Sequence, residues 1–168
     1  MELPPGFSVA ATGNTITVTS DRGAKAEHYF DGAKVSVKVE GSAVVVEPRG
    51  KQTRQMRAAV KTTLAHMRNM IGGLGKPYEK KLTLVYAHFP VSIEVKGNAV
   101  LIKNFLGEKT PRKASLVGSA KVKVAGQEIT VEGPDKEAVG QTANNIAKAT
   151  RITNKDIRVF QDGIYYST

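Results

Sequence analysis

The sequence predicts a fold of strands and helices in two copies of one plan, with β-hairpins that lead into a single helix in each copy. Three observations predict it. Short runs alternate between apolar and polar residues around turns such as Gly13–Asn14, which is typical of half-buried strands in hairpins. Two longer stretches carry apolar residues at helical spacing. The hairpin patterns recur after 84 or 85 positions, which indicates an internal duplication.

Composition narrows the class of protein. The chain has 168 residues, which allows one ordinary domain or two small ones, and its formal net charge is +10. Such a basic chain is typical of nucleic-acid binders. An anionic membrane would also attract it, but the sequence has no strongly hydrophobic amphipathic helix, no apolar run that could cross a bilayer and no signal-peptide pattern. The lack of cysteine excludes disulfides and thiolate metal sites and fits a reducing cytoplasm.

The hairpins of the two copies correspond in order. The strands expected in the first copy are Phe7–Thr12, Thr15–Ser20, Lys34–Val39 and Ala43–Glu47. Those expected in the second copy are Val91–Lys96, Ala99–Asn104 and the two strands within Lys121–Glu132. The identities after the shift include Ser8 with Ser92, Gly13 with Gly97, Asn14 with Asn98, Lys38 with Lys123, Gly41 with Gly126 and Glu47 with Glu132. Chance similarity is the alternative, because alternating Val and Lys strands are easy to match.

A helix is expected from about Lys51 to Ile71, after the hairpins of the first copy. Its predicted buried stripe consists of Met56, Val60, Leu64, Met67 and Ile71. No acidic residue occurs between Glu47 and Glu79, whereas a solvated helix usually mixes charges. The cations of this helix are therefore secondary candidates for RNA contact: Arg54, Arg57, Lys61 and Arg68. The alternative is a basic surface that serves solubility alone.

Glycines and a proline mark the boundary between the copies. Gly72, Gly73 and Gly75 are expected to end the helix, and Pro77 to prevent its continuation. We therefore expect an N-terminal domain at residues 1–75, a linker at 76–81 and a C-terminal domain at 82–168.

The segment from Gly107 to Ala114, between the hairpins of the second copy, is expected to be a basic loop. It carries Lys109, Arg112 and Lys113 against the single acid Glu108. The matching loop of the first copy has nearly balanced charges. Cations that release counterions from phosphates favour RNA binding, so the second copy is predicted to be the main binding domain. The alternative is a flexible, solvated loop.

The C-terminal stretch combines a helix with basic and aromatic residues. Pro134 is expected at the first helical position, with acidic Asp135 and Glu137 in the first turn. The predicted packing face is made of Val139, Ala143, Ile146, Ala147 and Thr150. The cations Lys148, Arg151, Lys155 and Arg158 are followed by Phe160, an Asp162–Gly163 turn and Tyr165–Tyr166. Cations beside exposed rings bind nucleic acid by phosphate charge and stacking. The alternative is that the rings belong to the core and the cations to a solvated helix end.

Catalytic motifs are absent from the sequence. His28, His66 and His88 are scattered without metal-ligand spacing, and there is no nucleophile motif or phosphate-binding glycine loop. Glu47 and Glu132 lie in separate copies, so we expect them to cap or stabilise turns and not to act as an acid–base pair. The sequence predicts no enzyme, no metal or other cofactor and no small-molecule substrate.

The last strand carries a specific motif, K-x-x-R-x-F-x-D-G-I-Y, from Lys155 to Tyr165. Together with the opening ELPPGFSV and the helix GPDKEAVGQTANNI, this motif resembles the sixth protein of the large ribosomal subunit in its archaeal and eukaryotic form. The resemblance runs from Glu2 to Tyr166 and therefore covers nearly the whole chain.

The resemblance implies an α+β fold of two duplicated domains, each an antiparallel β-sheet with one α-helix packed on it. It implies a structural constituent of the large ribosomal subunit, in the cytoplasm, near the stalk base and the sarcin–ricin loop where translation factors dock. The implied partners are large-subunit ribosomal RNA and neighbouring ribosomal proteins. Carried onto this chain, the RNA-binding residues are Lys109, Arg112, Lys113, Lys148, Arg151, Lys155, Arg158 and Tyr165.

Two alternative functions follow from the same residues. The first is a basic RNA-binding module outside the ribosome, although the sequence contains no RNP strand or KH-type GxxG loop. The second is a protein-interaction domain that pairs through edge strands such as AVVVEP. Steep salt dependence of RNA binding would argue against strand pairing.

Overall fold

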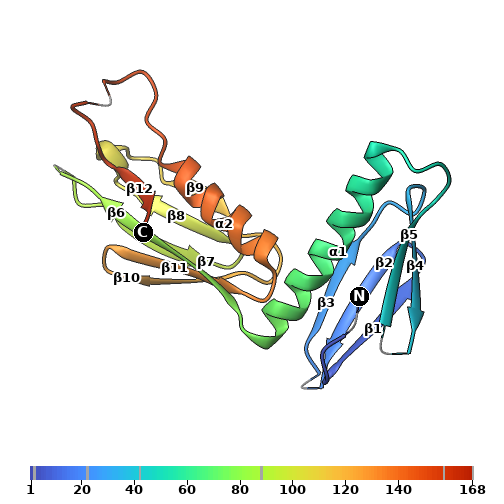
Figure 1. Ribbon diagram of the computed structural model, residues 1–168. Helices are drawn as coiled ribbons and strands as arrows, with labels where there is room; N and C mark the ends of the chain where they lie inside the picture. Colours follow the sequence, from blue (N-terminus) through green and yellow to red (C-terminus); the bar gives the residue numbers. More distant parts are fainter. Residues whose placement is uncertain (2, 22, 42, 88, 157, 168) are drawn as a thin grey trace. The chain divides into compact units, whose positions relative to one another are not determined.

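The computed structural model describes residues 1–168 except positions 2, 22, 42, 88, 157 and 168, so His88 lies outside the described residues. The chain divides into two compact units, Met1–Pro77 and Tyr78–Thr168. Figure 1 labels the helices and strands of each unit. No helix in the described ranges is long and apolar enough to cross a membrane.

The first unit contains five strands and one helix. Its elements are β1 (Phe7–Thr12), β2 (Thr15–Ser20), β3 (Lys25–Tyr29), β4 (Val35–Glu40), β5 (Ala43–Pro48) and α1 (Arg54–Gly75). The strands form a three-stranded antiparallel sheet, β1-β2-β3, and a separate β4-β5 ribbon. Helix α1 contacts strands of both sheets, and Ile16, Val44 and Met67 lie fully buried between them.

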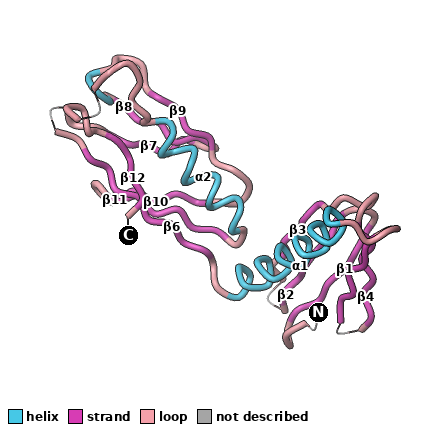
Figure 2. The backbone as a smooth tube through the Cα atoms, turned by 45° about the horizontal axis from the view of Figure 1, so that its top comes forward, coloured by secondary structure: helices cyan, strands magenta, loops and turns pink. Residues whose placement is uncertain are grey.

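The second unit repeats this order and adds two strands. Its elements are β6 (Tyr78–Val85), β7 (Ser92–Lys96), β8 (Ala99–Lys103), the 3-10 turn η1 (Phe105–Gly107), β9 (Arg112–Ser115), β10 (Lys121–Ala125), β11 (Glu128–Gly133), α2 (Lys136–Ala149) and β12 (Gly163–Tyr166). The antiparallel sheets are β7-β8-β9 and β10-β11-β6-β12. Helix α2 packs on strands of both sheets (Figure 2).

The repeated topology and the α+β class are as predicted. Each unit, however, has two antiparallel sheets instead of the one expected. A buried residue follows the last strand of the three-stranded sheet in each unit, Phe30 after β3 and Leu116 after β9. Glu47 and Glu132 do not cap turns. Glu132 pairs with Lys123 across its hairpin at 2.7 Å, and Glu47 pairs with Lys38 in the first unit at 3.3 Å. The two pairs are equivalent, because Lys123 lies 85 positions after Lys38 and Glu132 lies 85 positions after Glu47.

The expected linker at 76–81 is wrong for most of its length, because strand β6 begins at Tyr78. Glu79 pairs in register with Glu132 of β11, and Leu82 pairs with Ile129. Hydrophobic alternation does not predict this strand, because residues 79–81 are all exposed. On its other side β6 pairs with β12, where Ile164 lies opposite Leu84, so β12 forms the edge of the four-stranded sheet (Figure 1).

Helix α1 differs from its predicted extent and stripe. It begins at Arg54, after the Thr53 hydroxyl accepts a hydrogen bond from the Met56 N–H at 3.3 Å. It continues to Gly75 through the glycines that were expected to end it, and the Lys76 N–H donates to the Gly72 carbonyl. Of the predicted stripe, Met67 is buried, but the remaining members are half-buried: Met56, Val60, Leu64 and Ile71. The buried face instead contains Thr63, Met67, Met70 and Gly73, whose small members let the helix approach the sheets closely.

Helix α2 starts at Lys136, two residues later than predicted. Asp135 is the N-cap, and its Oδ1 accepts a hydrogen bond from the Glu137 N–H at 2.9 Å, so Pro134 precedes the cap. The predicted packing face is largely buried, with Ala147 half-buried. At Gly133 a Cβ would lie 2.9 Å from a methyl of Val139, which shows how closely β11 approaches α2.

Candidate nucleic-acid interface

An open groove of about 630 Å³ lies in the second unit, where α2 ends and the chain returns as β12. Its lining combines cations, aromatic rings and backbone from these segments: Ala147, Lys148, Thr150, Arg151, Ile152, Phe160, Asp162, Gly163, Ile164, Tyr165 and Tyr166. We call it the α2–β12 groove. In Figure 1 the long connection between α2 and β12 extends beyond the helix before it turns back beside β6.

The aromatic rings of the groove are open to solvent. Tyr165 and Tyr166 are 51% and 52% exposed, and Phe160 is 38% exposed. Their neighbour Ile164 is 3% exposed and belongs to the core. Strand β12 is thus anchored by Ile164, while its tyrosines remain available at the surface.

Tyr165 is held in place by local contacts. Its hydroxyl donates a hydrogen bond to the Gln161 carbonyl at 3.1 Å. Its ring lies over Gly163, where an added Cβ would come within 3.2 Å of three ring-end atoms. A glycine at this position therefore lets the ring lie flat against the backbone.

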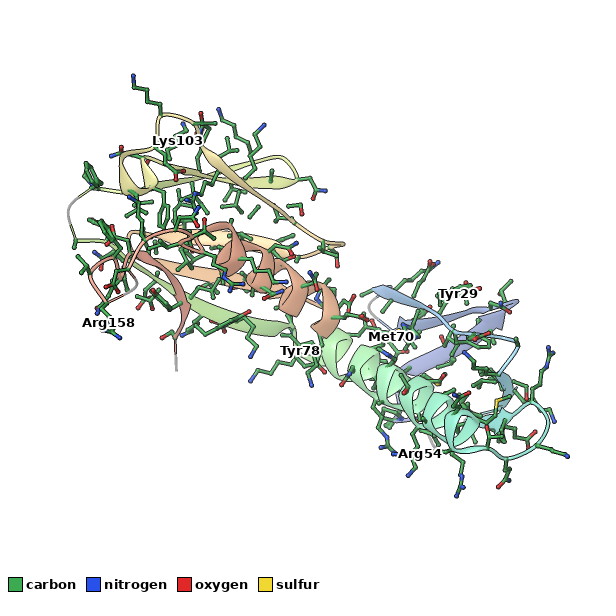
Figure 3. The ribbon with its side chains drawn as sticks, turned by 90° about the horizontal axis from the view of Figure 1, so that it is seen from above. Tyr29, Arg54, Met70, Tyr78, Lys103 and Arg158 are labelled. Atoms are coloured by element: carbon green, nitrogen blue, oxygen red, sulfur yellow. The ribbon has the colours of Figure 1, made fainter. Side chains whose placement is uncertain are left out.

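The cations of this region carry charges without acidic partners. Lys148, Arg151, Lys155 and Arg158 are all exposed, and within the described ranges none pairs with a carboxylate. The Lys155 ammonium lies 4.8 Å from the centroid of the Phe160 ring, a cation–π contact. Arg158 lies in the connection that precedes β12 (Figure 3). Of these four, Lys148 and Arg151 line the groove, so its rim is positively charged.

Two buried polar residues fix the walls of the groove. The Thr150 hydroxyl accepts a hydrogen bond from the Ile164 N–H at 2.9 Å and donates one to the Ala147 carbonyl at 3.0 Å, so it joins the end of α2 to β12. Asp162 is 5% exposed, and its Oδ1 accepts a hydrogen bond from the Ala87 N–H at 3.3 Å.

Arg112 has internal partners, although the sequence presents it as one cation of a solvated loop. Its guanidinium lies 4.5 Å from the Phe105 ring and binds both carboxylate oxygens of Glu108, at 2.8 and 2.6 Å. It also donates to the carbonyls of Ala149 and Arg151, at 3.0 and 3.1 Å. Arg112 therefore fastens the start of β9 to the end of α2, and the pairing lowers the pKa of Glu108 below its ordinary value.

The remaining cations of the expected loop differ from Arg112. Lys109 and Lys113 are exposed and have no carboxylate partner among the described residues. Only the first part of the segment is a loop, because Arg112–Ser115 forms β9 and pairs with β8. The strand escapes prediction because its short run has few apolar residues.

The structure therefore brings together part of the predicted set. Lys148, Arg151 and Tyr165 line the α2–β12 groove, and Lys155 reaches it through Phe160. Among the lining residues that carry a ring or a charge, Phe160, Asp162 and Tyr166 do not belong to the predicted set. The signal for them was present in the alternation of rings and turn residues in VFQDGIYY, but ring exposure depends on the tertiary fold.

The secondary candidates lie on the outer surface of α1. Arg54, Arg57, Lys61 and Arg68 are all exposed, and Arg54 projects from the first turn of the helix (Figure 3). Across the described residues none of the four pairs with a carboxylate. Arg68 lines a pocket together with Met1, Pro4 and Ile71, and this lining contains no aromatic ring.

The scattered histidines are partly brought together. His28 of β3 and His66 of α1 stack with ring centroids 4.0 Å apart and planes inclined by 19°. This contact is not predictable from local sequence patterns, because 37 intervening residues separate the two histidines. Both rings are half-buried, which agrees with packing of α1 on β3.

Comparison with known proteins agrees with the fold. The family model for ribosomal protein L6 matches residues 89–163. The chain is 42% identical over its full length to large ribosomal subunit protein uL6 of Methanocella arvoryzae, covering 94% of that relative. It is 45% identical to uL6 of Methanococcus vannielii and 42% identical to uL6 of Methanosarcina mazei, in each case over 98% of this chain and 90% and 93% of the relative.

Fold and surface define a duplicated α+β protein with a basic, partly aromatic face on its second unit. The extent of the matches is decisive for its family, since they cover both units. The chain belongs to the ribosomal protein L6 family.

Proposed function

We propose that this chain is a structural constituent of the large ribosomal subunit and binds large-subunit ribosomal RNA mainly through its second unit. The observation that carries the proposal is the α2–β12 groove, where exposed cations without acidic partners stand beside exposed rings. The relatives of this chain bear the name of large-subunit proteins, which supports ribosomal RNA as the polyanion and the cytoplasmic ribosome as the location.

Binding in this proposal rests on phosphate neutralisation. Lys148, Arg151, Lys155 and Arg158 release counterions from the RNA backbone. Lys109 and Lys113 add contacts near β9, while Arg112 acts as a positioning residue for the end of α2. Such contacts recognise the shape and path of the backbone without specifying a base sequence.

The cations of α1 form a second, weaker surface in this proposal. They are as exposed as those of the groove, but no aromatic ring lines the pocket to which Arg68 contributes. We assign them a secondary contact with RNA through charge alone.

We further propose that the protein lies near the stalk base and the sarcin–ricin loop, with other ribosomal proteins as neighbours and translation factors docking nearby. No catalytic step, cofactor or small-molecule substrate enters this function. The protein would act by holding RNA segments in a fixed relation, for which a rigid scaffold of sheets is suited.

Sedimentation combined with RNA footprinting tests the proposal. A tagged full-length chain is expressed in archaeal cells, and lysates are separated on sucrose gradients. The chain is expected to comigrate with large subunits and to leave that fraction after nuclease digestion. Chemical probing of reconstituted particles is expected to show protection in the sarcin–ricin region. A chain at the top of the gradient would contradict the ribosomal assignment, and protection confined to a distant RNA region would contradict the proposed place.

A further inference from the structure

We propose that the α2–β12 groove takes one unpaired RNA base, stacked on the exposed Tyr165 ring of β12, with its phosphate held by Lys148 and Arg151. This inference rests on the proposed function and adds to it a specific ligand at a specific site. It concerns the base itself, whereas phosphate neutralisation does not require any base to enter the groove.

The Tyr165 ring has the properties of a stacking platform. Tyr165 is half exposed on an edge strand whose Ile164 is buried, so the strand is ordered while this ring is not covered. Tyr166 is also half exposed, but it follows Tyr165 directly in the strand and projects to the opposite face. Tyr165 is fixed by its bond to the Gln161 carbonyl and by contact with Gly163. A ring that is ordered before binding loses little conformational entropy when a base stacks on it.

The groove is large enough for a nucleotide. Its volume of about 630 Å³ lies within the range of about 300–1,000 Å³ found for small-molecule sites. It is open on one side, so a nucleotide could enter without leaving its RNA strand.

Charge orients the nucleotide in the groove. Asp162 is nearly buried in the wall, and its carboxylate disfavours a phosphate at depth. Lys148 and Arg151 are exposed and attract the phosphate to the rim. The base therefore points inward to the Tyr165 ring and the backbone lies along the cations.

Paired bases do not fit this site. Bases in an RNA duplex are stacked on their neighbours, and the deep, narrow major groove hides their edges from side chains. Bases in loops, bulges and ends can be unstacked and placed on aromatic side chains. The ligand is thus a single-stranded or bulged position in RNA, stacked through its face, with little dependence on which base it is.

Binding of a model oligonucleotide tests the inference. The full-length chain is titrated into fluorescein-labelled hexa-adenylate and into an abasic hexamer with the same sugar–phosphate backbone, with fluorescence anisotropy as readout. Wild type is expected to bind hexa-adenylate about 5- to 150-fold more tightly than the abasic hexamer, the range for stacking of one base. Equal affinities would overturn the inference.

Variants separate the Tyr165 ring from other effects. Y165L is expected to lose the preference for bases and to keep the affinity for the abasic hexamer. Y165F is expected to retain the preference, because its ring remains. Tyr29→Leu is the matched control, since Tyr29 is 68% exposed in the first unit and has no place in the groove. A leucine variant that keeps the base preference would contradict the inference.

Failure of this inference can be told apart from failure of the proposed function. The same preparations are tested with protein-free large-subunit ribosomal RNA. Tight, salt-dependent binding of that RNA without a base preference would overturn stacking alone. Absence of ribosomal RNA binding by wild type would overturn the proposed function as well.

Discussion

The Arg112 guanidinium lies 2.6 Å from Glu108 Oε1 and donates a hydrogen bond at 3.0 Å to the Ala149 carbonyl at the end of α2. This arrangement connects the 3-10 turn, β9 and the helix whose last turn borders the α2–β12 groove. A cation that the sequence presents as a phosphate contact is therefore part of the scaffold. Arg112 does not line the groove, but it holds the end of α2 that forms one wall of the groove.

Replacement of Arg112 by alanine is expected to destabilise the second unit by about 2 kcal/mol. The change removes hydrogen bonds from a charged donor to two carbonyls and to Glu108, together with the contact to Phe105. Lysine at this position is expected to recover less than half of the loss, because it lacks the fork of the guanidinium. Urea unfolding followed by circular dichroism measures both effects.

Lys113→Ala is the matched control for that experiment. Lys113 is an exposed neighbour on the same strand, and its removal is expected to change stability by less than about 0.5 kcal/mol. Equal stabilities for the Arg112 and Lys113 variants would show that Arg112 does not fasten β9 to α2.

The Glu108–Arg112 pair also predicts a dependence on pH. The hydrogen bond from Arg112 lowers the pKa of Glu108, so its stabilising effect is complete above the ordinary glutamate pKa of about 4.3 and is lost as the pH falls through the lowered value. Glu108→Gln is expected to lower stability at pH 7 by less than about 1 kcal/mol, because the pair is partly exposed. Melting temperatures of variant and wild type should converge as the pH falls below the ordinary glutamate pKa of about 4.3. A difference that stays constant with pH would be the contrary result.

Thr150 predicts a link between stability and RNA binding. In Thr150→Val the Ile164 N–H loses its buried acceptor, at an expected cost of about 1–3 kcal/mol. Since that bond joins α2 to β12, affinity for large-subunit RNA should fall even where the variant is fully folded. Thr150→Ser keeps the hydroxyl and is expected to restore most of both properties. Calorimetry measures the stability of each variant, and filter binding measures the RNA affinity of the same samples. A loss of stability in Thr150→Val without a loss of affinity would contradict the predicted link.

Two glycines around α2 are expected to respond in opposite directions to alanine. Gly133→Ala places a Cβ 2.9 Å from Val139 and 3.4 Å from the Ala120 backbone, so it should destabilise the second unit by about 1–3 kcal/mol. Gly140 lies within α2 with open space at the Cβ position, and alanine there should stabilise by about 0.5–1 kcal/mol. The unfolding midpoints of both variants are compared with that of wild type. A shift of both midpoints in the same direction would contradict the packing described for this helix.

The hairpins show how far the sequence determines the fold. Residues Phe7–Thr12 and Thr15–Ser20 are strands with the predicted bounds, because their alternation is strong and a Gly–Asn turn joins them. Strands β3, β6 and β9 were missed. They are short or rich in exposed polar residues, and their pairing with distant strands stabilises them more than local pattern does. The separation of each unit into two sheets depends on such pairing and was also missed.

The candidate site was predictable by charge but not by geometry. The exposed cations Lys148 and Arg151 were identified because four cations gather within eleven residues. The internal role of Arg112 was not, because its partners at Ala149 and Arg151 lie 37 and 39 positions away. The same holds for the exposure of Tyr166, since nothing local distinguishes a ring at a sheet edge from a ring in a core.

Salt dependence of binding tests the central claim, that the second unit binds ribosomal RNA through the rim of the groove. Affinity for protein-free large-subunit RNA is measured at KCl concentrations from about 50 to about 300 mM, because the slope of affinity against salt reports the number of phosphate contacts. Lys148→Ala/Arg151→Ala is expected to flatten the log–log slope by about 1.4–1.8, from about 0.7–0.9 for each of two contacts. Arg54→Ala/Arg57→Ala removes the same charge from α1 and should change the slope less. An unchanged slope for the groove variant, with a loss for the α1 variant, would contradict the account.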